Sequence, residues 1–276
     1  MVINKKTNIL IILIVILGFI SGVYFNNILI GGKETPKITV SSLTERHIED
    51  LMISFSTNFD PTQSNRVHNI KLAARTLTNY LLPPGEVFSF NRVINDTTAE
   101  KGYKAAPIIV GGELVPGIGG GICQLSSTLY NAALLANLEI LERHSHQLTV
   151  PYIEPGRDAT ISYPYKDLAF RNNKDHSVLI TADVENDILL IKLFGQPLTE
   201  RVEIKTKVLD IIMPPEKYKL ESELRPGEEK LIEGYPGFLV EVWKIVYRGE
   251  KKESEVKISV DRYAPYPEII IQKQTN

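Results

Sequence analysis

The hydrophobic pattern of the chain begins with an apolar run near the N-terminus. Residues 9–25 read ILIILIVILGFISGVYF, and Lys5 and Lys6 precede them. The run approaches the ~20 apolar residues that a membrane-spanning helix needs. Because basic residues tend to stay on the cytoplasmic side, the pattern predicts a transmembrane helix in residues 1–30, with the rest of the chain outside the cytoplasm.

A cleaved signal peptide is the alternative interpretation of this segment. Its apolar region typically covers only about 7 to 15 residues and ends in a small-x-small cleavage site. Here the run is longer, and Val23 to Asn26 stand where small residues are expected. We therefore expect an uncleaved anchor, followed over residues 31–48 by a stalk with mixed charge and little periodicity.

Two segments beyond the stalk have helical periodicity. From Asn65 to Leu82, apolar residues recur near one face, and Pro83, Pro84 and Gly85 end the pattern. The segment 125–138, LSSTLYNAALLANL, repeats leucine and alanine at helical spacing with few charges. The first pattern predicts an amphipathic helix, and the second predicts a buried helix.

Short runs with β-branched and aromatic residues surround these helices. Runs typical of strands lie at residues 86–94, 158–163, 177–184 and 187–195. From Arg201 onward, strands rich in Glu and Lys alternate with glycine turns. The fold class is therefore α+β: a mixed α/β catalytic domain over residues 49–198 is followed by a small all-β module over residues 199–276.

Composition narrows the function of the chain. The 31 basic and 33 acidic side chains give a formal charge of −2, which offers no reason to expect nucleic acid as a partner. With 43% apolar and 23% charged residues, most of the chain should fold. A single cysteine, Cys123, excludes an intramolecular disulfide and a zinc site with several thiolates.

Cys123 stands where a glycine-rich turn meets the buried helix. Unpaired N–H groups and the helix dipole at such a position favour the thiolate, which is the reactive form of cysteine. The N–H groups near Gly120 and Gly121 would also stabilise the oxyanion of a tetrahedral intermediate. The alternatives are a small buried apolar residue and a phosphate loop, but the Lys-Ser/Thr pair of a Walker motif is absent.

A nucleophilic thiol needs a base. His144 and His146 follow the helix in a segment with strand-like alternation, so both are expected to share one face. Asp158 would orient the imidazole in a Cys/His/Asp arrangement, or it caps a turn. Arg143 and Arg157 would pair with a substrate carboxylate, or they are solvated. No metal is expected, because these histidines lack a third ligand at a standard spacing.

The chain strongly resembles the VanW-like family of bacterial surface proteins over residues 65–195. The matching segments are NIKLAARTLTNYLLPPGEVFSFN, KGYKAAPII, PGIGGGICQLSSTLYNAAL, ERHSHQLTVPYIEPGRDATISYPYKDLAFRNN and SVLI. The resemblance implies a peptidoglycan L,D-transpeptidase that uses the motif cysteine. In that reaction, the thiolate attacks the carbonyl after the third stem-peptide residue, releases D-alanine and passes the acyl group to an amine of another stem.

The resemblance also assigns roles to single residues. Cys123 matches the nucleophile, His146 matches the base with His144 as a second candidate, and Asp158 matches the Gly-x-Asp-Ala-Thr motif. Gln124 and Ser126 belong to the Gly-Gly-Gly-Ile-Cys-Gln-x-Ser block. The predicted substrate-binding and oxyanion residues are Gly120, Gly121, Gln124, Ser126 and Arg157.

Residues 199–276 resemble the glycine-marked repeat called the G-five domain. The resemblance rests on Pro226-Gly227, Glu233-Gly234, Pro236-Gly237 and Arg248-Gly249. Expected partners are peptidoglycan stem peptides and the membrane through the N-terminal helix, with no cofactor and no nucleic acid. The alternatives to a transpeptidase are a non-catalytic peptidoglycan-binding protein and a cysteine amidase or carboxypeptidase.

Overall fold

The computed structural model describes Ile48, residues 50–225 and residues 228–273. The predicted membrane anchor in residues 1–30, and all of the predicted stalk except Ile48, lie outside these ranges. Within them, no helix combines the length and apolar character needed to cross a membrane.

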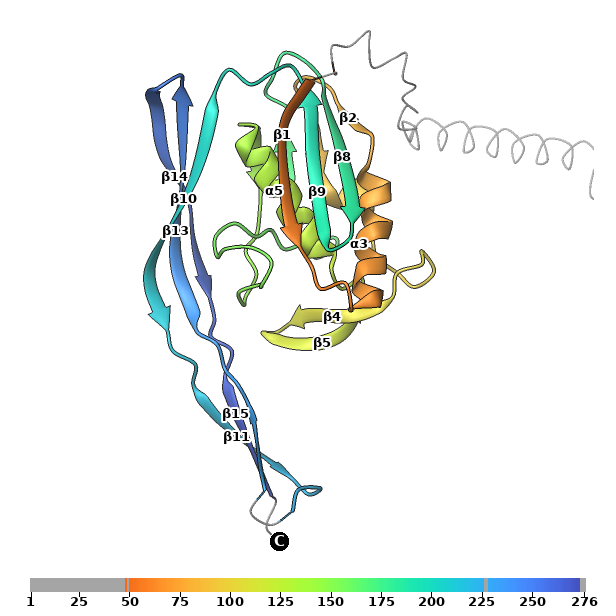
Figure 1. Ribbon diagram of the computed structural model, residues 1–276, viewed down its shortest axis with the longest axis vertical. Coiled ribbons are helices and arrows are strands. Elements are labelled where there is room, and N and C mark those ends of the chain that lie inside the picture. Colours follow the sequence, from red (N-terminus) through yellow and green to blue (C-terminus); the bar gives the residue numbers. More distant parts are fainter. Residues whose placement is uncertain (1–47, 49, 226–227, 274–276) are drawn as a thin grey trace, which may run out of the picture. The chain divides into compact units, whose positions relative to one another are not determined.

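A four-stranded antiparallel sheet forms the centre of the domain that precedes the all-β module (Figure 1). Its strand order is β1 (Asp50–Asn58), β9 (Ile188–Gly195), β8 (Val178–Glu185) and β2 (Tyr80–Leu82). In β9 every second residue is buried, so Leu189, Ile191 and Leu193 face the core. The strands predicted at 177–184 and 187–195 are confirmed.

Two helices pack on this sheet and on each other. α3 (Ser64–Leu77) lies against β8, and α5 (Ile122–Leu135) lies against β1 and β9. Both helices were predicted from their periodicity. The expectation that the first helix continues to Pro83 is wrong, because Asn79 adopts a positive φ of 65° and the chain turns into β2.

Small sheets complete the domain. β3 (Val87–Ser89) pairs with β7 (Ala169–Arg171), which pairs with β6 (Glu139–Glu142), and β4 (Ala105–Val110) forms a hairpin with β5 (Glu113–Ile118). The strand predicted over 86–94 ends at Ser89. The Ser89 side chain then accepts a hydrogen bond from the N–H of Arg92 and caps the short helix α4 (Phe90–Ile94).

Two other predicted strands are absent from their positions. Residues 143–150 form a loop after β6, and residues 158–161 form an extended segment without a strand partner. The N–H groups of this second segment bind side chains of α5 in place of a neighbouring strand. The alternation of apolar and polar residues cannot reveal that side chains take the place of a strand, because it indicates which face is buried and not which groups form the hydrogen bonds.

The C-terminal module is all-β, as predicted. One sheet has the order β10 (Arg201–Ile212), β13 (Gly237–Arg248) and β14 (Lys251–Tyr263). A second sheet has the order β11 (Glu216–Glu221), β15 (Glu268–Lys273) and β12 (Glu229–Ile232).

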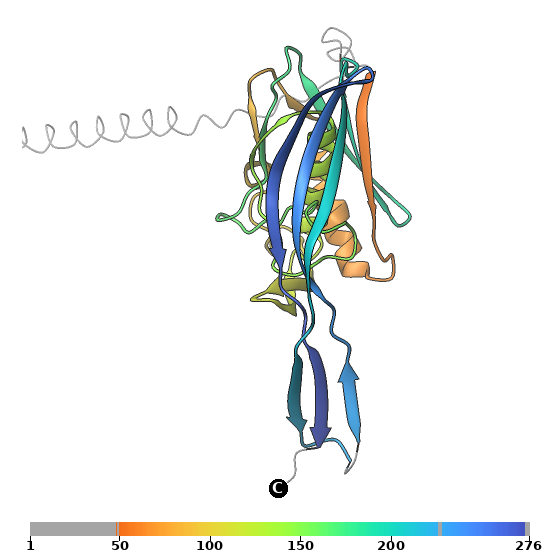
Figure 2. The same ribbon diagram turned by 90° about the vertical axis from the view of Figure 1, so that its left-hand side faces the viewer.

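The first sheet of the module packs directly against the preceding domain. Figure 2 looks onto β10, β13 and β14, with α5 behind them. Ile204 of β10 and Ile258 of β14 pack on the core of the domain, and the N–H of Ala264 donates to the carbonyl of Gln147 at 2.7 Å. The module therefore packs against the core of the domain that precedes it.

Gly156 provides a test of this packing. It has a φ of +90°, and a Cβ built there would lie 2.4 Å from Cγ2 of Val242. Gly156→Ala should lower the free energy of unfolding by about 2 to 4 kcal/mol, since about 1 to 2 kcal/mol comes from the backbone and the rest from the overlap. Urea unfolding measures this change.

Gly85→Ala is the matched control, because Gly85 also has a positive φ of +75° but no atom within 4 Å of the added Cβ. It should cost only the backbone contribution of about 1 kcal/mol. Equal costs for the two variants would show that the module does not press on Gly156.

Candidate active site

Cys123 lies in the first turn of α5, directly after a glycine turn. Gly121 caps the helix with a φ of +107°, a conformation that other residues rarely adopt. At Gly120, a Cβ would come 2.7 Å from the carbonyl oxygen of Pro107. The glycines are thus required by close backbone approach, and they place Cys123, a half-buried residue, at the edge of a cleft.

One face of α5 holds the extended segment Arg157–Ile161 in place. Cys123, Ser127 and Asn131 are four residues apart, so they lie on one line along the helix. Four residues of a helix advance about 6 Å and two residues of an extended segment advance about 6.6 Å, so α5 and the extended segment stay in register. The three contacts are Ile161 N–H to Cys123 Sγ at 3.4 Å, Ala159 N–H to Ser127 Oγ at 2.8 Å, and Asn131 Nδ2 to Arg157 O at 2.7 Å.

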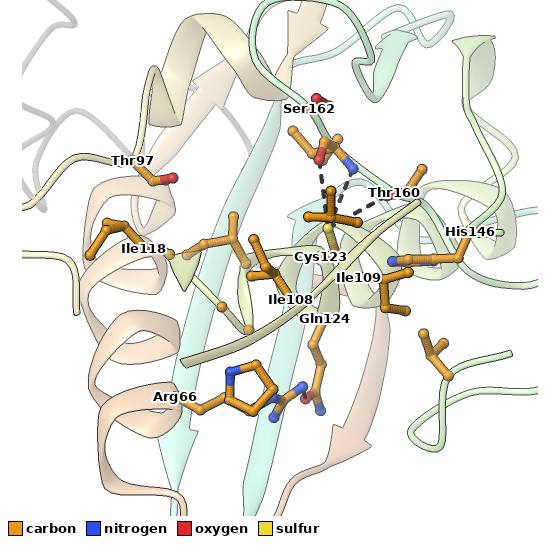
Figure 3. A pocket seen from close by; sticks show the side chains of 18 of the residues that line it. Arg66, Thr97, Ile108, Ile109, Ile118, Cys123, Gln124, His146, Thr160 and Ser162 are labelled. Atoms are coloured by element: carbon orange, nitrogen blue, oxygen red, sulfur yellow. Dashed lines mark hydrogen bonds between the residues drawn. The ribbon is translucent and has the colours of Figure 1, made fainter. Parts of the chain in front are cut away.

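This arrangement turns the side chain of Asp158 toward His146. Asp158 Oδ2 lies 2.5 Å from His146 Nδ1 and accepts the backbone N–H of His146 at 2.7 Å. Both side chains are nearly inaccessible to solvent, with 6% of His146 and 1% of Asp158 exposed. Because Nδ1 is held by the carboxylate, Nε2 is left to face the thiol, and Figure 3 shows the imidazole beside Cys123.

The ionisation of the thiol and the imidazole is coupled. Burial raises the pKa of Cys123, but the hydrogen bond and charge of His146, with smaller contributions from Ile161 and Thr160, outweigh burial and lower it. Burial also opposes the charge on His146, yet Asp158 and Cys123 together raise the pKa of His146 to about 9. Both shifts favour the thiolate and imidazolium forms of the pair over the neutral forms.

The carboxylate of Asp158 has further partners on its other side. Arg143 Nη2 donates to Asp158 Oδ1 at 2.9 Å, and the hydroxyl of Tyr263 donates to the same oxygen. Arg143 Nη1 also donates to Asp261 Oδ2 at 2.6 Å. Burial raises the pKa of Asp158, but these donors and His146 lower it below its usual value. Asp261 and Tyr263 belong to β14, so the module supports the site.

The cleft beside Cys123 has a volume of about 1110 Å³. One wall is the β4–β5 hairpin, with apolar side chains such as Ile108, Ile109 and Ile118 (Figure 3). The opposite wall includes His146, Thr160, Ile161 and the ring of Tyr152. A cleft of this size and apolar character accommodates a peptide-sized ligand.

The structure brings together most of the predicted site. Cys123, His146, Asp158, Gly120 and Gly121 meet at the start of α5 as expected. The predicted base His144 does not join them. Because residues 143–150 are a loop and not a strand, the two histidines do not share a face, and His144 Nε2 lies 2.9 Å from Glu142 Oε1 instead.

The predicted substrate-binding residues have other positions or roles. Arg157 does not line the cleft, since its Nε donates to Asn131 Oδ1 at 2.7 Å and its guanidinium lies over Phe55. Arg143 is buried against Asp158 and is not solvated. Ser126 is fully buried and donates to the carbonyl of Ala159 at 2.6 Å, so it supports the segment that carries Asp158.

Gln124 lines the cleft, but its amide is not available to an oxyanion. Its Nε2 donates to Thr57 Oγ1 at 2.8 Å and to the carbonyl of Asn58 at 2.9 Å, which uses both hydrogens. Its Oε1 accepts a hydrogen bond from Arg66 Nη2 at 2.7 Å. Gln124 therefore positions Arg66, a cleft residue that the sequence did not point to.

Comparisons with known proteins show a family and relatives to which part of the chain is similar. Residues 65–194 match the family model "VanW like protein". The chain is 47% identical to YoaR of Bacillus subtilis over 141 residues, which cover 51% of this chain and 46% of YoaR. It is 35% identical to vancomycin B-type resistance protein VanW of Enterococcus faecalis over 159 residues, covering 54% of this chain and 55% of that protein. The chain spans about half the length of these curated relatives.

Two solved structures are similar to part of the chain. The G5 domain of IgA1 protease is 20% identical, covers 30% of this chain and 100% of its own, and has a TM-score of 0.20. The HP0197-G5 structure is 18% identical, covers 26% of this chain and 96% of its own, and has a TM-score of 0.16. Both structures are named as G5 domains.

Replacing His146 should raise the pKa of the thiol. In His146→Gln the lowering effect of the imidazolium is lost and burial remains, so the midpoint of Cys123 alkylation by iodoacetamide should move above the ~8.5 of a free cysteine. At pH 7 the rate should fall at least about tenfold, since each unit of pKa changes the thiolate population tenfold. His144→Gln is the control and should keep the midpoint of the wild type. A shared shift in both variants would rule out the specific pairing of Cys123 with His146.

Removing the hydroxyl of Tyr263 should destabilise the fold. This group donates to buried Asp158 and accepts the N–H of Gly156 at 2.6 Å. Tyr263→Phe should therefore lower the free energy of unfolding by about 1.5 to 3 kcal/mol, as expected for a hydrogen bond to a charged group. In Tyr247→Phe the ring over which Arg201 stacks is kept, and the cost measured by urea unfolding should stay within about 0.5 kcal/mol.

Proposed function

Because residues 65–194 form a VanW-like domain, we propose that the protein is a cysteine-dependent acyltransferase that cross-links peptidoglycan stem peptides. The observation that carries the proposal is the buried chain of contacts from Asp158 through His146 to the thiol of Cys123. Acyl transfer through a covalent intermediate requires a nucleophile, a base that contacts it and a carboxylate that orients the base.

The first half of the reaction forms a thioester. The thiolate of Cys123 attacks the carbonyl carbon after the third stem residue, and an S–C bond forms. The C–N bond to the terminal D-alanine then breaks, and the leaving amine takes the proton from Nε2 of His146. The backbone N–H of Cys123 has no acceptor within the described chain, so it is free to stabilise the oxyanion.

The second half transfers the acyl group. An amine on the side chain of another stem gives a proton to His146 and attacks the thioester, so that a C–N bond forms and the C–S bond breaks. Asp158 keeps the imidazole oriented through both proton transfers. With water as the acceptor, the same groups would perform hydrolysis, which is the amidase or carboxypeptidase alternative.

The proposed substrate places the catalytic domain outside the cytoplasm, tethered by the apolar segment at residues 9–25. The relative from Enterococcus faecalis is named a vancomycin B-type resistance protein, and this name supports a role connected with the cell wall. A non-catalytic peptidoglycan-binding protein is the competing proposal. The coupled ionisation of the thiol and the imidazole favours chemistry over binding alone.

Wall digests from cells that express the protein test the proposal. Cross-links between third residues should appear with the wild type and be absent with Cys123→Ala, since no other thiol exists in the chain. His146→Gln should reduce their formation by about 100-fold or more. His144→Gln should retain it within about twofold, because this side chain lies outside the cleft.

Equal cross-linking by Cys123→Ala and the wild type would contradict catalysis and favour a binding protein. Mass spectrometry of a purified disaccharide-tetrapeptide substrate separates the two enzymatic outcomes, because only a transferase yields a dimer. A product that has lost its terminal D-alanine without dimer would assign the protein as a hydrolase.

A further inference from the structure

Arg66 has an unusual place on the amphipathic helix α3. It lies one turn before Ile70, on the side of the helix that packs against the domain, and its side chain enters the cleft beside Cys123 (Figure 3). The guanidinium is fixed there by two contacts. Nη2 donates to Gln124 Oε1 at 2.7 Å, and the carbon between the nitrogens lies 5.8 Å from the centre of the Tyr152 ring.

This positive charge has no acidic partner in the part of the chain that the structure describes. Arg143, Arg171, Arg201 and Arg248 each form an ion pair with a carboxylate, and Arg66 forms none. Only one of its five N–H groups donates to a protein atom within these ranges. A half-buried cation that binds a single neutral amide has most of its donor capacity unused.

Neither of the two acidic side chains that line the cleft forms an ion pair with Arg66, although the charge of Asp60 acts on Arg66 from a longer distance. Asp60 accepts hydrogen bonds from Thr62 and Gln63 at the start of α3, and Asp96 pairs with Lys101. The cleft therefore contains a guanidinium that no carboxylate of the described chain contacts directly. Burial lowers the pKa of Arg66, and the charges of Tyr152, Cys123 and Asp60 partly counter this effect. The guanidinium and the thiol of Cys123 line the same cavity.

We propose that Arg66, held by Gln124, binds a free carboxylate of the ligand that occupies this cleft. A guanidinium matches the planar carboxylate through paired N–H donors, and such pairs strengthen where water is excluded. Gln124 is a positioning residue in this arrangement, because its two amide hydrogens are anchored on Thr57 and Asn58 and its oxygen aims the guanidinium.

For the reaction, this inference rests on the proposed acyl transfer. A carboxylate bound at Arg66 while a carbonyl lies at Cys123 fits a donor whose last residue is the leaving group. The protein would then act on peptides that end one residue after the attacked bond and reject peptides that continue. This selection follows from charge, because an amidated or extended end leaves the guanidinium unpaired.

Alkylation of Cys123 tests the carboxylate site without any assumption about the natural substrate. Iodoacetate and iodoacetamide both alkylate the thiolate with loss of iodide, and they differ only in a carboxylate against an amide. The full chain has one cysteine, so labelling reports this site alone. The ratio of the two rates cancels any change in the thiolate population, since both reagents consume the same thiolate.

In Arg66→Gln the ratio of the iodoacetate rate to the iodoacetamide rate should fall about tenfold relative to the wild type. Arg66→Lys should give an intermediate ratio, because lysine keeps the positive charge but lacks the paired N–H donors of the guanidinium. Arg157→Gln is the matched control, since Arg157 is also half-buried and lacks a carboxylate partner but lies outside the cleft. Its ratio should equal that of the wild type.

An unchanged ratio in Arg66→Gln would overturn the inference, and so would an equal loss of both rates, which would mean that the guanidinium only supports the fold. A stem tetrapeptide and its C-terminal amide then connect the site to the reaction. Acylation of Cys123 should favour the free acid at least about tenfold in the wild type and show no preference in Arg66→Gln.

The two proposals fail separately. If neither peptide acylates the wild type, the proposed function is wrong, while the ratio of the two alkylation rates still decides whether Arg66 binds a carboxylate. If the peptides acylate but the preference survives in Arg66→Gln, the carboxylate site is wrong and the proposed acylation of Cys123 stands.

Discussion

The structure depends on one buried carboxylate. Asp158 is 1% exposed, and an ion at such a position is tolerated only when hydrogen bonds and opposite charges surround it. His146 and Arg143 supply the charges, and the backbone of His146 and the hydroxyl of Tyr263 supply further donors. Because these groups come from the loop after β6 and from strand β14, neutralising Asp158 joins the two parts of the described fold and orients the imidazole at the same time.

Much of the fold follows from periodicity. The helices α3 and α5 and the strands β8 and β9 appear where apolar residues repeat at helical or strand spacing. The segment 158–161 and the loop 143–150 differ, because their polar backbone groups are satisfied by side chains of α5 and by neighbouring loops. Cysteine, serine and asparagine at every fourth position of α5 form the hydrogen bonds that a neighbouring strand would otherwise form. In the sequence, such a helix has the same pattern as an ordinary buried helix.

The catalytic candidates were predictable to a similar degree. A glycine turn before a lone cysteine indicates Cys123, and the family motifs indicate His146 and Asp158. Two further signals in the sequence mark residues of the site or its support. Arg66 occupies the apolar stripe of α3, four residues before Ile70, where a charged residue is out of place. At the end of β14 the alternation is inverted, since Val260 is 52% exposed while Asp261 is buried. Of these two residues, Arg66 lines the cleft and Asp261 forms an ion pair with Arg143.

The reach of Tyr263 back to Asp158 has a consequence for how the molecule is made. The two residues are 105 positions apart, so a nascent chain carries the cysteine, the histidine and the aspartate long before it carries the hydroxyl and the carboxylate of β14. Until that strand docks, Arg143 lacks Asp261 and the aspartate lacks one donor. The sulfur therefore gains its full electrostatic environment only after β14 has been synthesised and the sheet of β10, β13 and β14 has docked.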